Sequence, residues 1–489
     1  MKVVLLFPAF GRNYAFQPPL GVAYLGAVLR REQIPVMIID AAKYTYRNGN
    51  VYELFKYEIS KLKPDIVGLS VPSALSEQAY MAARIAKKVL PNVVTIMGGP
   101  HPTAVPEEVI KHEEIDIAVV GEGDFIISDL VRAIENGFSL KKIKGVYYKD
   151  NGQVVSTPPQ DFCNDLDSLP FPARDMLPMK EYLRQRPLMP TPFPATTMMT
   201  SRGCPRNCLF CQPTGRRLFG AGNRKHSIKR VVDEMEFLVK TYKVRGIGFV
   251  DDEAANDKER TIALCKEIIR RKLKVKWYCS SRVDLADEEK FRWMKKAGCI
   301  QISFGVESGS QKILNYYRKG IKVEQTKRAF KLCRDIGIMA RANLMIGAPE
   351  DTYETVQETI NLVHEIKPDL ISTAATTPVV GTDLFENVRN AGLLKKKVLG
   401  EIDRFDISTM KRHYLSDNDV RILIQRVVKA YKKELFSSLF NPKMIYKRRV
   451  LMLNILNYWW TLLQQPRAFA DALKYYLTYE KKERITDNC

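Results

Sequence analysis

Short apolar runs alternate with amphipathic segments over the first 140 residues of the chain. The apolar runs, which we expect to be strands, are Val3–Phe7, Val36–Ile39, Ile66–Leu69, Val93–Met97 and Ile117–Val120. Segments with helical periodicity, such as Gly21–Arg31 and Ser76–Val89, separate them. This alternation predicts an α/β fold with a doubly wound, flavodoxin- or Rossmann-like sheet over 1–140, whose ligands bind beyond the carboxyl ends of the strands.

A second alternating block follows at 195–400. Its expected strands are Thr196–Thr200, Ile247–Val250, Val275–Cys279, Ile300–Phe304, Ala342–Ile346 and Leu370–Ala374. Six strand–helix units predict a partial (β/α)6 barrel, because a complete eightfold barrel usually needs a longer chain. Between the blocks, prolines crowd residues 141–194, which we expect to be a connector rather than part of a sheet. Residues 401–489 are predicted to form a basic helical region.

Length and composition fit a protein of two or three domains. Of the 489 residues, 45% are apolar and 27% charged, the balance of a soluble globular protein. The N-terminus lacks the pattern of a signal peptide, and no apolar run is long enough to span a membrane. We therefore expect a cytoplasmic protein. The net charge of +22 favours an acidic partner: nucleic acid, an anionic membrane surface or an acidic substrate.

Three of the nine cysteines lie within eight residues, directly after the first expected barrel strand. Cys204, Cys208 and Cys211 have the spacing C-x3-C-x2-C. Three thiolates so placed can hold three irons of a 4Fe–4S cluster and leave the fourth iron open. Structural zinc is the alternative, but zinc needs a fourth ligand, for which His226 is a candidate across a Gly- and Arg-rich stretch.

This cysteine pattern, with Phe210 before its last member, resembles that of the radical S-adenosylmethionine (SAM) enzymes over residues 195–390. The resemblance implies that the three cysteines are cluster ligands and that Phe210 packs near the adenine of SAM. It also implies that SAM binds the open iron. One electron, from a donor such as ferredoxin or flavodoxin, then cleaves SAM to a 5′-deoxyadenosyl radical.

Polar groups at later strand ends match the same family. The resemblance implies Asp252 as a contact for the SAM amino group and Arg282 as a partner for its carboxylate. Glu307 and Ser308 are expected at the ribose or the methionine moiety, and the Met345–Glu350 turn near the adenine. Taken singly, each acid is better explained as a helix cap or a solvated ion pair, but together at successive strand ends they are hard to explain by packing.

Three loop motifs of the N-terminal block are Pro18–Gly21, which leads into a helix, Gly98–Thr103 and Gly121–Asp124. They resemble those of the cobalamin-binding domain of one radical SAM subgroup. That subgroup includes the anaerobic magnesium-protoporphyrin monomethyl ester cyclase and related lipid-modifying and methyl-transferring enzymes. The cobalamin contacts implied by the resemblance are Ser70, Gly98, Gly99, Gly121, Glu122 and Gly123. Glycines permit the close approach of a bulky ligand. A nucleotide or flavin is the rival ligand, although no G-x-G-x-x-G follows the first strand.

One departure concerns the axial ligand of cobalt. The D-x-H-x-x-G sequence that supplies a histidine in many cobalamin proteins is absent. His101 stands between two prolines, where we expect a rigid loop rather than a ligand. Cobalamin is then predicted to bind without a histidine on cobalt; the alternative is a degenerate domain that has lost cobalamin.

Three functions remain open at this point. Methylation of an unactivated carbon in a hydrophobic, lipid-like substrate is favoured. Cyclisation, carbon–carbon coupling or oxidation of such a substrate is the alternative. Modification of nucleic acid is a third class, disfavoured because the region after 400 shows no small β-barrel. An apolar run with tryptophans, Val450–Leu463, lies among basic residues, which predicts contact with the cytoplasmic face of an anionic membrane. A helical cap on the barrel is its alternative.

Overall fold

Seven strands form the N-terminal sheet, in the order β2-β1-β3-β4-β5-β6-β7. In this computed structural model the described residues are 1–10, 17–46, 50–184, 191–211, 218–395 and 407–438. The strands are β1 Val3–Phe7, β2 Val36–Asp40, β3 Ile66–Ser70, β4 Val94–Gly98, β5 Ile117–Val119, β6 Val146–Asp150 and β7 Gln153–Ser156. The first five are parallel, and each predicted strand is confirmed to within one residue at either end.

Apolar side chains of β1 alternate between two cores, which is why helices cover both faces of the sheet. Val3 and Leu5 pack with one core, and Val4 and Leu6 pack with the other. The first core includes α1 Leu20–Arg31 and α6 Ile127–Glu135; the second includes α2 Val51–Leu62, α3 Ser76–Val89 and α5 Pro106–Val109. The doubly wound prediction is confirmed. The strand order reverses between β1 and β3, the point where such sheets bind ligands.

The sheet continues into the segment predicted to be a connector. Strands β6 and β7 are antiparallel and joined by a turn at Asn151 and Gly152, both with positive φ. This Asn-Gly pair is a typical hairpin turn, and the surrounding prolines obscure it in the sequence. The prediction of a segment without sheet was therefore wrong over 146–156, and the domain boundaries stay proposals.

Six parallel strands form the second sheet, in the order β15-β14-β13-β12-β11-β8. They are β8 Ala195–Met198, β11 Gly246–Phe249, β12 Lys276–Ser281, β13 Cys299–Glu307, β14 Met339–Ile346 and β15 Leu370–Ala375. The predicted strands are confirmed to within three residues. Because β8 and β15 are the two edges, the sheet is an open half-barrel, as predicted. A two-stranded ribbon, β9 Ser201–Arg202 with β10 Arg224–Lys225, was not predicted.

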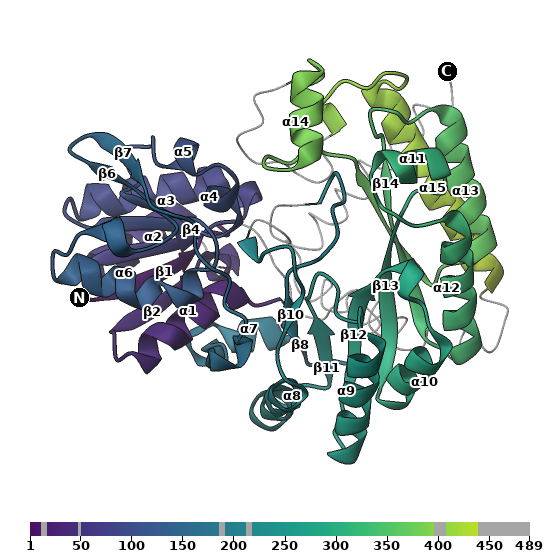
Figure 1. Cartoon of the computed structure of the whole chain (residues 1–489), viewed down its shortest axis with the longest axis horizontal. Coiled ribbons are helices and arrows are strands. Elements are labelled where there is room, and N and C mark those ends of the chain that lie inside the picture. The colour runs from purple at the N-terminus through teal and green to yellow at the C-terminus, as the bar shows by residue number, and fades with distance from the viewer. Residues whose placement is uncertain (11–16, 47–49, 185–190, 212–217, 396–406, 439–489) are drawn as a thin grey trace.

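Helices line the convex side of the half-barrel (Figure 1). They are α8 Ile228–Tyr242, α9 Lys258–Arg270, α10 Glu288–Lys296, α12 Val323–Ile336, α13 Tyr353–Ile366 and α15 Asp417–Ser438. Four cysteines, Cys265, Cys279, Cys299 and Cys333, are buried in the core beneath these helices. The shorter helices are α4 Pro100–Ala104, α7 Met179–Arg184, α11 Gln311–Tyr316 and α14 Asp383–Asn390.

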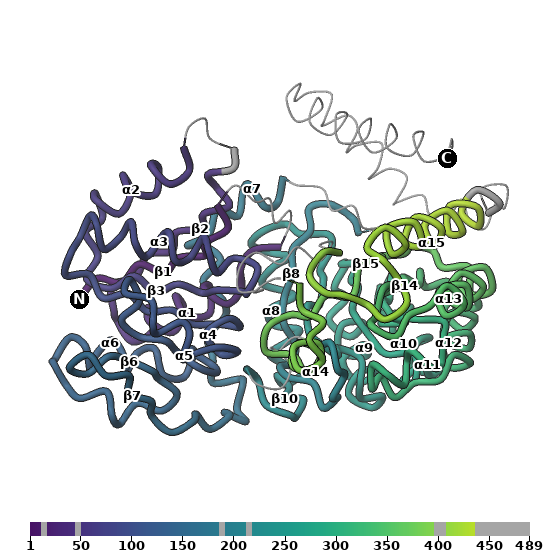
Figure 2. Tube along the Cα trace, turned by 90° about the horizontal axis from the view of Figure 1, so that it is seen from above, coloured from purple at the N-terminus to yellow at the C-terminus, as the bar shows by residue number. Residues whose placement is uncertain are grey.

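The last described helix, α15, belongs to the barrel. Val420, Leu423 and Val427 join the core, and the Tyr431 hydroxyl donates to the carbonyl of Asp369 over 3.0 Å. In the view from above, the helix lies beside β14, β15 and α13 (Figure 2). None of the helices in the described part of the chain has the length and apolarity to cross a membrane. The predictions for Val450–Leu463 lie outside the described residues.

Candidate functional site

The cysteine loop, residues 203–211, begins where the first barrel strand ends, and a buried acid fixes its start. Asp251, just after β11, accepts hydrogen bonds from the Thr200 amide and the Ser201 hydroxyl, each over 2.7 Å, and from the Thr200 hydroxyl. Burial raises the pKa of Asp251. The two strand ends β8 and β11 are thus tied together directly ahead of Cys204.

Backbone geometry fixes the loop itself. Gly203 has φ +86°, and a Cβ there would lie 2.3 Å from the carbonyl oxygen of Gly222. The Asn223 amide donates to the Gly203 carbonyl over 2.9 Å. Further along, the Leu209 amide donates to the carbonyl of Tyr317 over 2.9 Å. The loop is therefore held from both ends.

Burial and the charge of neighbouring thiols raise the pKa of Cys204 and of Cys211, so the three cysteines interact electrostatically. Cys204 and Cys208 are half-buried and Cys211 is exposed. Within the described ranges, no three His, Cys, Asp or Glu side chains are arranged to hold a metal ion. His226, the candidate fourth zinc ligand, instead places its Nδ1 3.0 Å from the Asp167 carboxylate.

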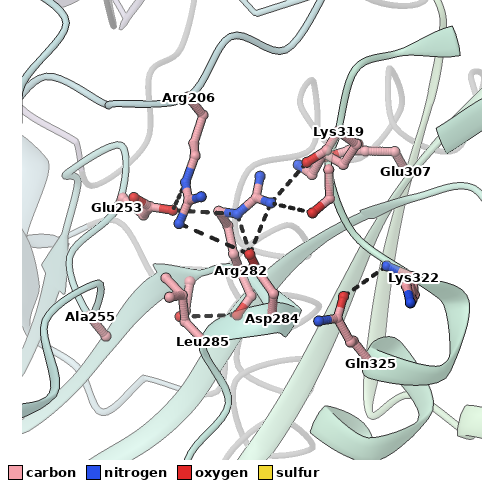
Figure 3. Close-up of polar contacts among 12 residues, drawn as sticks. Arg206, Glu253, Ala255, Arg282, Asp284, Leu285, Glu307, Lys319, Lys322 and Gln325 are labelled. Atoms are coloured by element: carbon pink, nitrogen blue, oxygen red, sulfur yellow. Dashed lines mark hydrogen bonds and ion pairs between the residues drawn. The ribbon is translucent and has the colours of Figure 1, made fainter. Parts of the chain in front are cut away.

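Two arginines converge on a buried carboxylate beside this loop (Figure 3). The Nε atoms of Arg206 and Arg282 each lie 3.6 Å from Oε1 of Glu253, whose side chain is 2% exposed. Among the described residues, no donor reaches either Glu253 oxygen within hydrogen-bond distance. Arg282 is itself held by Asp284, through bonds of 2.9 and 3.2 Å, and by the carbonyl of Lys319 at 2.8 Å.

A buried ion pair lies next to Arg282 (Figure 3). The Lys319 ammonium donates to Glu307 over 2.7 Å, and it lies 5.7 Å from the centre of the Phe210 ring. Gly305 makes room for the pair, because a Cβ there would come within 2.5 Å of Glu307 and 2.6 Å of Lys319. Burial opposes the charge of Lys319, but Glu307 and Cys208 raise its pKa, so the ammonium persists.

Small residues meet at the carboxyl ends of the N-terminal strands. A Cβ on Gly21 would lie 3.5 Å from the Ser70 hydroxyl, and one on Gly99 would lie 3.6 Å from it. Gly99 has φ +98°, and its Cβ would also come 3.0 Å from the Val71 amide nitrogen. The glycine-lined edge predicted from the sequence is therefore present beside the β1/β3 reversal.

Glu122, unlike these glycines, contacts two arginines of the second domain. Its carboxylate is 3% exposed and lies 2.8 Å from Arg202 and 2.8 Å from Arg224, both in the ribbon that flanks the cysteine loop. Its neighbour Gly121 has φ +92°, and the Gly121 amide donates to the Thr103 hydroxyl over 3.1 Å. The loop after β5 thus contacts the half-barrel.

Comparison with known proteins assigns both parts of the chain. Residues 198–363 match the model of the radical SAM superfamily, and residues 13–131 match that of the B12 binding domain. The chain is 34% identical, over 453 residues, to an uncharacterised methyltransferase of Pyrococcus horikoshii, covering 91% of this chain and 94% of that protein. It is 33% identical, over 400 residues, to the anaerobic magnesium-protoporphyrin IX monomethyl ester cyclase of Rubrivivax gelatinosus, covering 79% and 70%. The chain belongs to the radical SAM superfamily.

A solved structure supports the arrangement of this radical SAM chain. A cobalamin-dependent SAM radical enzyme, OxsB, has the same fold with a TM-score of 0.72 at 19% identity, over 91% of this chain and 71% of that chain. The radical SAM and B12-binding domains confirm, at the level of the domains, the predicted set of a 4Fe–4S cluster, SAM and cobalamin. The predicted enzyme class is also confirmed.

The structure shows where the residues predicted to contact SAM lie. Phe210 packs against the cluster of Ile313, Tyr317 and Ala348, against which Met345 also packs, so it lies near the turn predicted to contact adenine. Asp252 is exposed, whereas its neighbour Glu253 is buried and faces the arginines. The Ser308 hydroxyl is 3.2 Å from that of Thr359 and accepts from the Ser310 amide, within the scaffold. The roles of these residues toward SAM stay predictions.

His101 lies in the short helix α4, not in the loop that was expected. The prolines on either side permit a helical turn, because proline is well tolerated in the first turn of a helix. The ring is 1% exposed, its Nε2 lies 3.2 Å from the Tyr80 hydroxyl, and burial lowers its pKa to about 4. An enclosed ring is consistent with the prediction that His101 does not bind cobalt.

The residues present fit the cofactors of the radical SAM family. Arg282 and Lys319 both lie close enough to Cys208 to interact with it electrostatically, so each would stabilise a thiolate there. Glu253 offers two buried oxygens that lack a described donor, which suits an ammonium ligand. Sequence inspection missed Asp251, Glu253, Lys319 and Arg202. Only the acidic run 251–253 gave a signal, and it did not separate its members.

Proposed function

We propose that this radical SAM enzyme methylates an unactivated carbon of a hydrophobic substrate, with lipids as the favoured class. One observation carries the proposal: the cysteine loop abuts the B12-binding domain. Arg202, two residues before Cys204, lies 2.8 Å from Glu122 and 2.6 Å from Asp124 of the loop after β5. A methylation that starts with a radical and ends with a cobalamin methyl group requires both cofactor sites to face one substrate.

Each group of residues has a distinct role in this proposal. Cys204, Cys208 and Cys211 hold the cluster, Glu253 accepts hydrogen bonds from the SAM ammonium, and Phe210 packs on the adenine side. When bound, SAM on the cluster supplies a 5′-deoxyadenosyl radical and cobalamin supplies the methyl group. An electron donor such as ferredoxin or flavodoxin completes the system. Ser70, Gly98 and Gly99 line the cobalamin edge.

Ring closure or coupling is the second candidate. The cyclase relative, 33% identical and 70% covered, supports it, since its named substrate is also a large, largely apolar molecule. The methyltransferase relative is covered over 94% of its length, which supports methyl transfer as the first choice. Both candidates begin with the same SAM cleavage, and they differ in whether a second SAM supplies methyl groups.

The products of SAM distinguish the two. The full chain is reconstituted anaerobically with iron, sulfide and cobalamin, reduced with titanium(III) citrate, and its SAM products are measured by mass spectrometry. We expect 5′-deoxyadenosine together with S-adenosylhomocysteine, and loss of deoxyadenosine in the Cys204→Ala/Cys208→Ala/Cys211→Ala variant. Deoxyadenosine without S-adenosylhomocysteine would favour ring closure or coupling. Equal deoxyadenosine in the variant would contradict the cluster assignment.

A further inference from the structure

Four charged side chains, of which Glu122 and Arg202 are buried, join the two domains. We call Glu122, Asp124, Arg202 and Arg224 the interdomain ion cluster. Arg202 lies 2.8 Å from Glu122 and 2.6 Å from Asp124, and Arg224 lies 2.8 Å from the second oxygen of Glu122. Arg202 and Glu122 are each 3% exposed, so solvent does not screen their interaction.

Both ends of the cluster are anchored next to predicted cofactor residues. Glu122 and Asp124 come from the loop after β5, between and beside Gly121 and Gly123. Arg202 lies in β9, and Arg224 is its direct partner across the ribbon in β10. Cys204 follows Arg202 by two residues. A shift of either loop therefore separates charges that are buried together.

The Arg202 guanidinium is also enclosed by aromatic rings from both domains. It lies 5.2 Å from the ring centre of Tyr24, in α1, and 5.4 Å from that of Phe219. A planar guanidinium that lies between two rings and contacts two carboxylates through one nitrogen, Nη1, has a single well-defined position. A buried pair is costly when one partner is removed, because the other charge stays buried and uncompensated. The arrangement is therefore suited to fixing geometry.

We propose that Arg202 is a positioning residue that couples the two cofactor sites. It holds the cysteine loop in register with the Gly121–Asp124 loop, so that assembly of the iron–sulfur cluster strengthens cobalamin binding and the reverse. The inference rests on the proposed function in one respect, that both cofactors bind. It assigns Glu122 to the domain contact rather than to cobalamin.

The test compares cobalamin affinity with and without the iron–sulfur cluster. Hydroxocobalamin is titrated into the iron-free and the cluster-loaded full chain, and the ratio of the two dissociation constants is the coupling. We expect cluster loading to tighten binding about fivefold or more in the natural chain, the lower end of typical couplings. In Arg202→Lys we expect a ratio near one, because lysine lacks the Nη1 atom that contacts both acids. Equal ratios in the two proteins would overturn the proposal.

Arg174→Lys is the matched control. Arg174 is also fully buried and lies 2.7 Å from Glu234 of α8, away from both loops in sequence. Its replacement removes a comparable ion pair, so a general loss of stability would appear in both variants. We expect the coupling ratio to stay at its natural value in Arg174→Lys; a collapse there too would mean that Arg202 is merely structural.

Hydrogen exchange separates this proposal from the proposed function, because it needs no cobalamin. Cluster loading should slow amide exchange over residues 121–125 of the natural chain and leave it unchanged in Arg202→Lys. That result supports coupling of the two loops through Arg202 even if hydroxocobalamin fails to bind, whereas failure of hydroxocobalamin to bind would count against the proposed function. The same response in both proteins would overturn the role of Arg202.

Discussion

Glu253 and Asp252 are neighbours in the sequence, yet only one faces the arginines. The chain alternates between buried and exposed residues beyond β11: Phe249, Asp251 and Glu253 are buried, and Val250 and Asp252 are exposed. This is the period of two of an extended chain. The sequence predicted a SAM contact within the acidic run 251–253. Because Phe249 is apolar and buried, the alternation places Asp251 and Glu253 on the buried side of the chain. Val250 is apolar but exposed, so the sequence alone does not show which residues alternate toward the interior.

Replacement of Glu253 tests its assignment. Glu253→Gln removes the negative charge that would pair with the SAM ammonium, and we expect the SAM dissociation constant of the cluster-loaded chain to rise about ten- to a hundredfold, the worth of a charged hydrogen bond. Isothermal titration calorimetry measures it. Asp252→Asn is the control and should change the constant by less than about threefold if Glu253 alone accepts hydrogen bonds from the SAM ammonium. The reverse order would reinstate Asp252 as the contact.

Lys319 and Glu307 depend on each other because both are buried, each about 9% exposed. Lys319→Met leaves Glu307 uncompensated, so we expect the free energy of unfolding of the iron-free chain to fall by about 3–5 kcal/mol. Urea denaturation measures it. Lys331→Met is the control: Lys331 lies 2.8 Å from Asp335 but is 73% exposed, and about 1 kcal/mol or less is expected. Equal losses in the free energy of unfolding would show that burial does not make Glu307 more dependent on its partner.

Among the elements, the long strands were predictable and the short ribbons were not. Alternating apolar runs located every parallel strand to within three residues, because burial on both faces demands continuous apolar sequence. The ribbon of β9 and β10 spans two residues a strand and has no periodicity to detect. It nevertheless positions Arg202 and Arg224. The interdomain ion cluster was therefore beyond sequence reasoning, because its partners lie about 80 residues apart.

The cysteine loop gives a prediction at the same scale. Gly203→Ala places a Cβ 2.3 Å from the Gly222 carbonyl, at φ +86°, so the loop must move. We expect less than half the natural iron content after reconstitution, with circular dichroism unchanged. Gly152→Ala is the control, because Gly152 has φ +80° but nothing within 4 Å of an added Cβ. Gly152→Ala has the same energetic cost of a side chain at positive φ, but its Cβ meets no neighbouring atom. Full iron in Gly203→Ala would show that the loop tolerates displacement.

Charge is distributed unevenly over the whole molecule. Residues 439–489 hold nine of the 77 Lys and Arg residues and four of the 55 Asp and Glu residues, so most of the net charge of +22 lies in residues 1–438. The aromatic run Tyr458–Trp460, by contrast, lies in that last segment. Two sources of membrane affinity are thereby separated along the chain: general electrostatic attraction, and insertion of aromatic and apolar side chains at the headgroup level.

Vesicle sedimentation distinguishes these sources. We compare the full chain with a chain ended at Asn441, on anionic and on neutral vesicles, at low and at moderate salt. If the last segment drives contact, only the full chain sediments with anionic vesicles, and part of its binding resists salt because apolar insertion is not screened. If charge alone acts, both chains bind at low salt and both release as salt rises. That second outcome, or no binding at all, would remove the membrane argument for a lipid substrate and leave methylation of a hydrophobic small molecule.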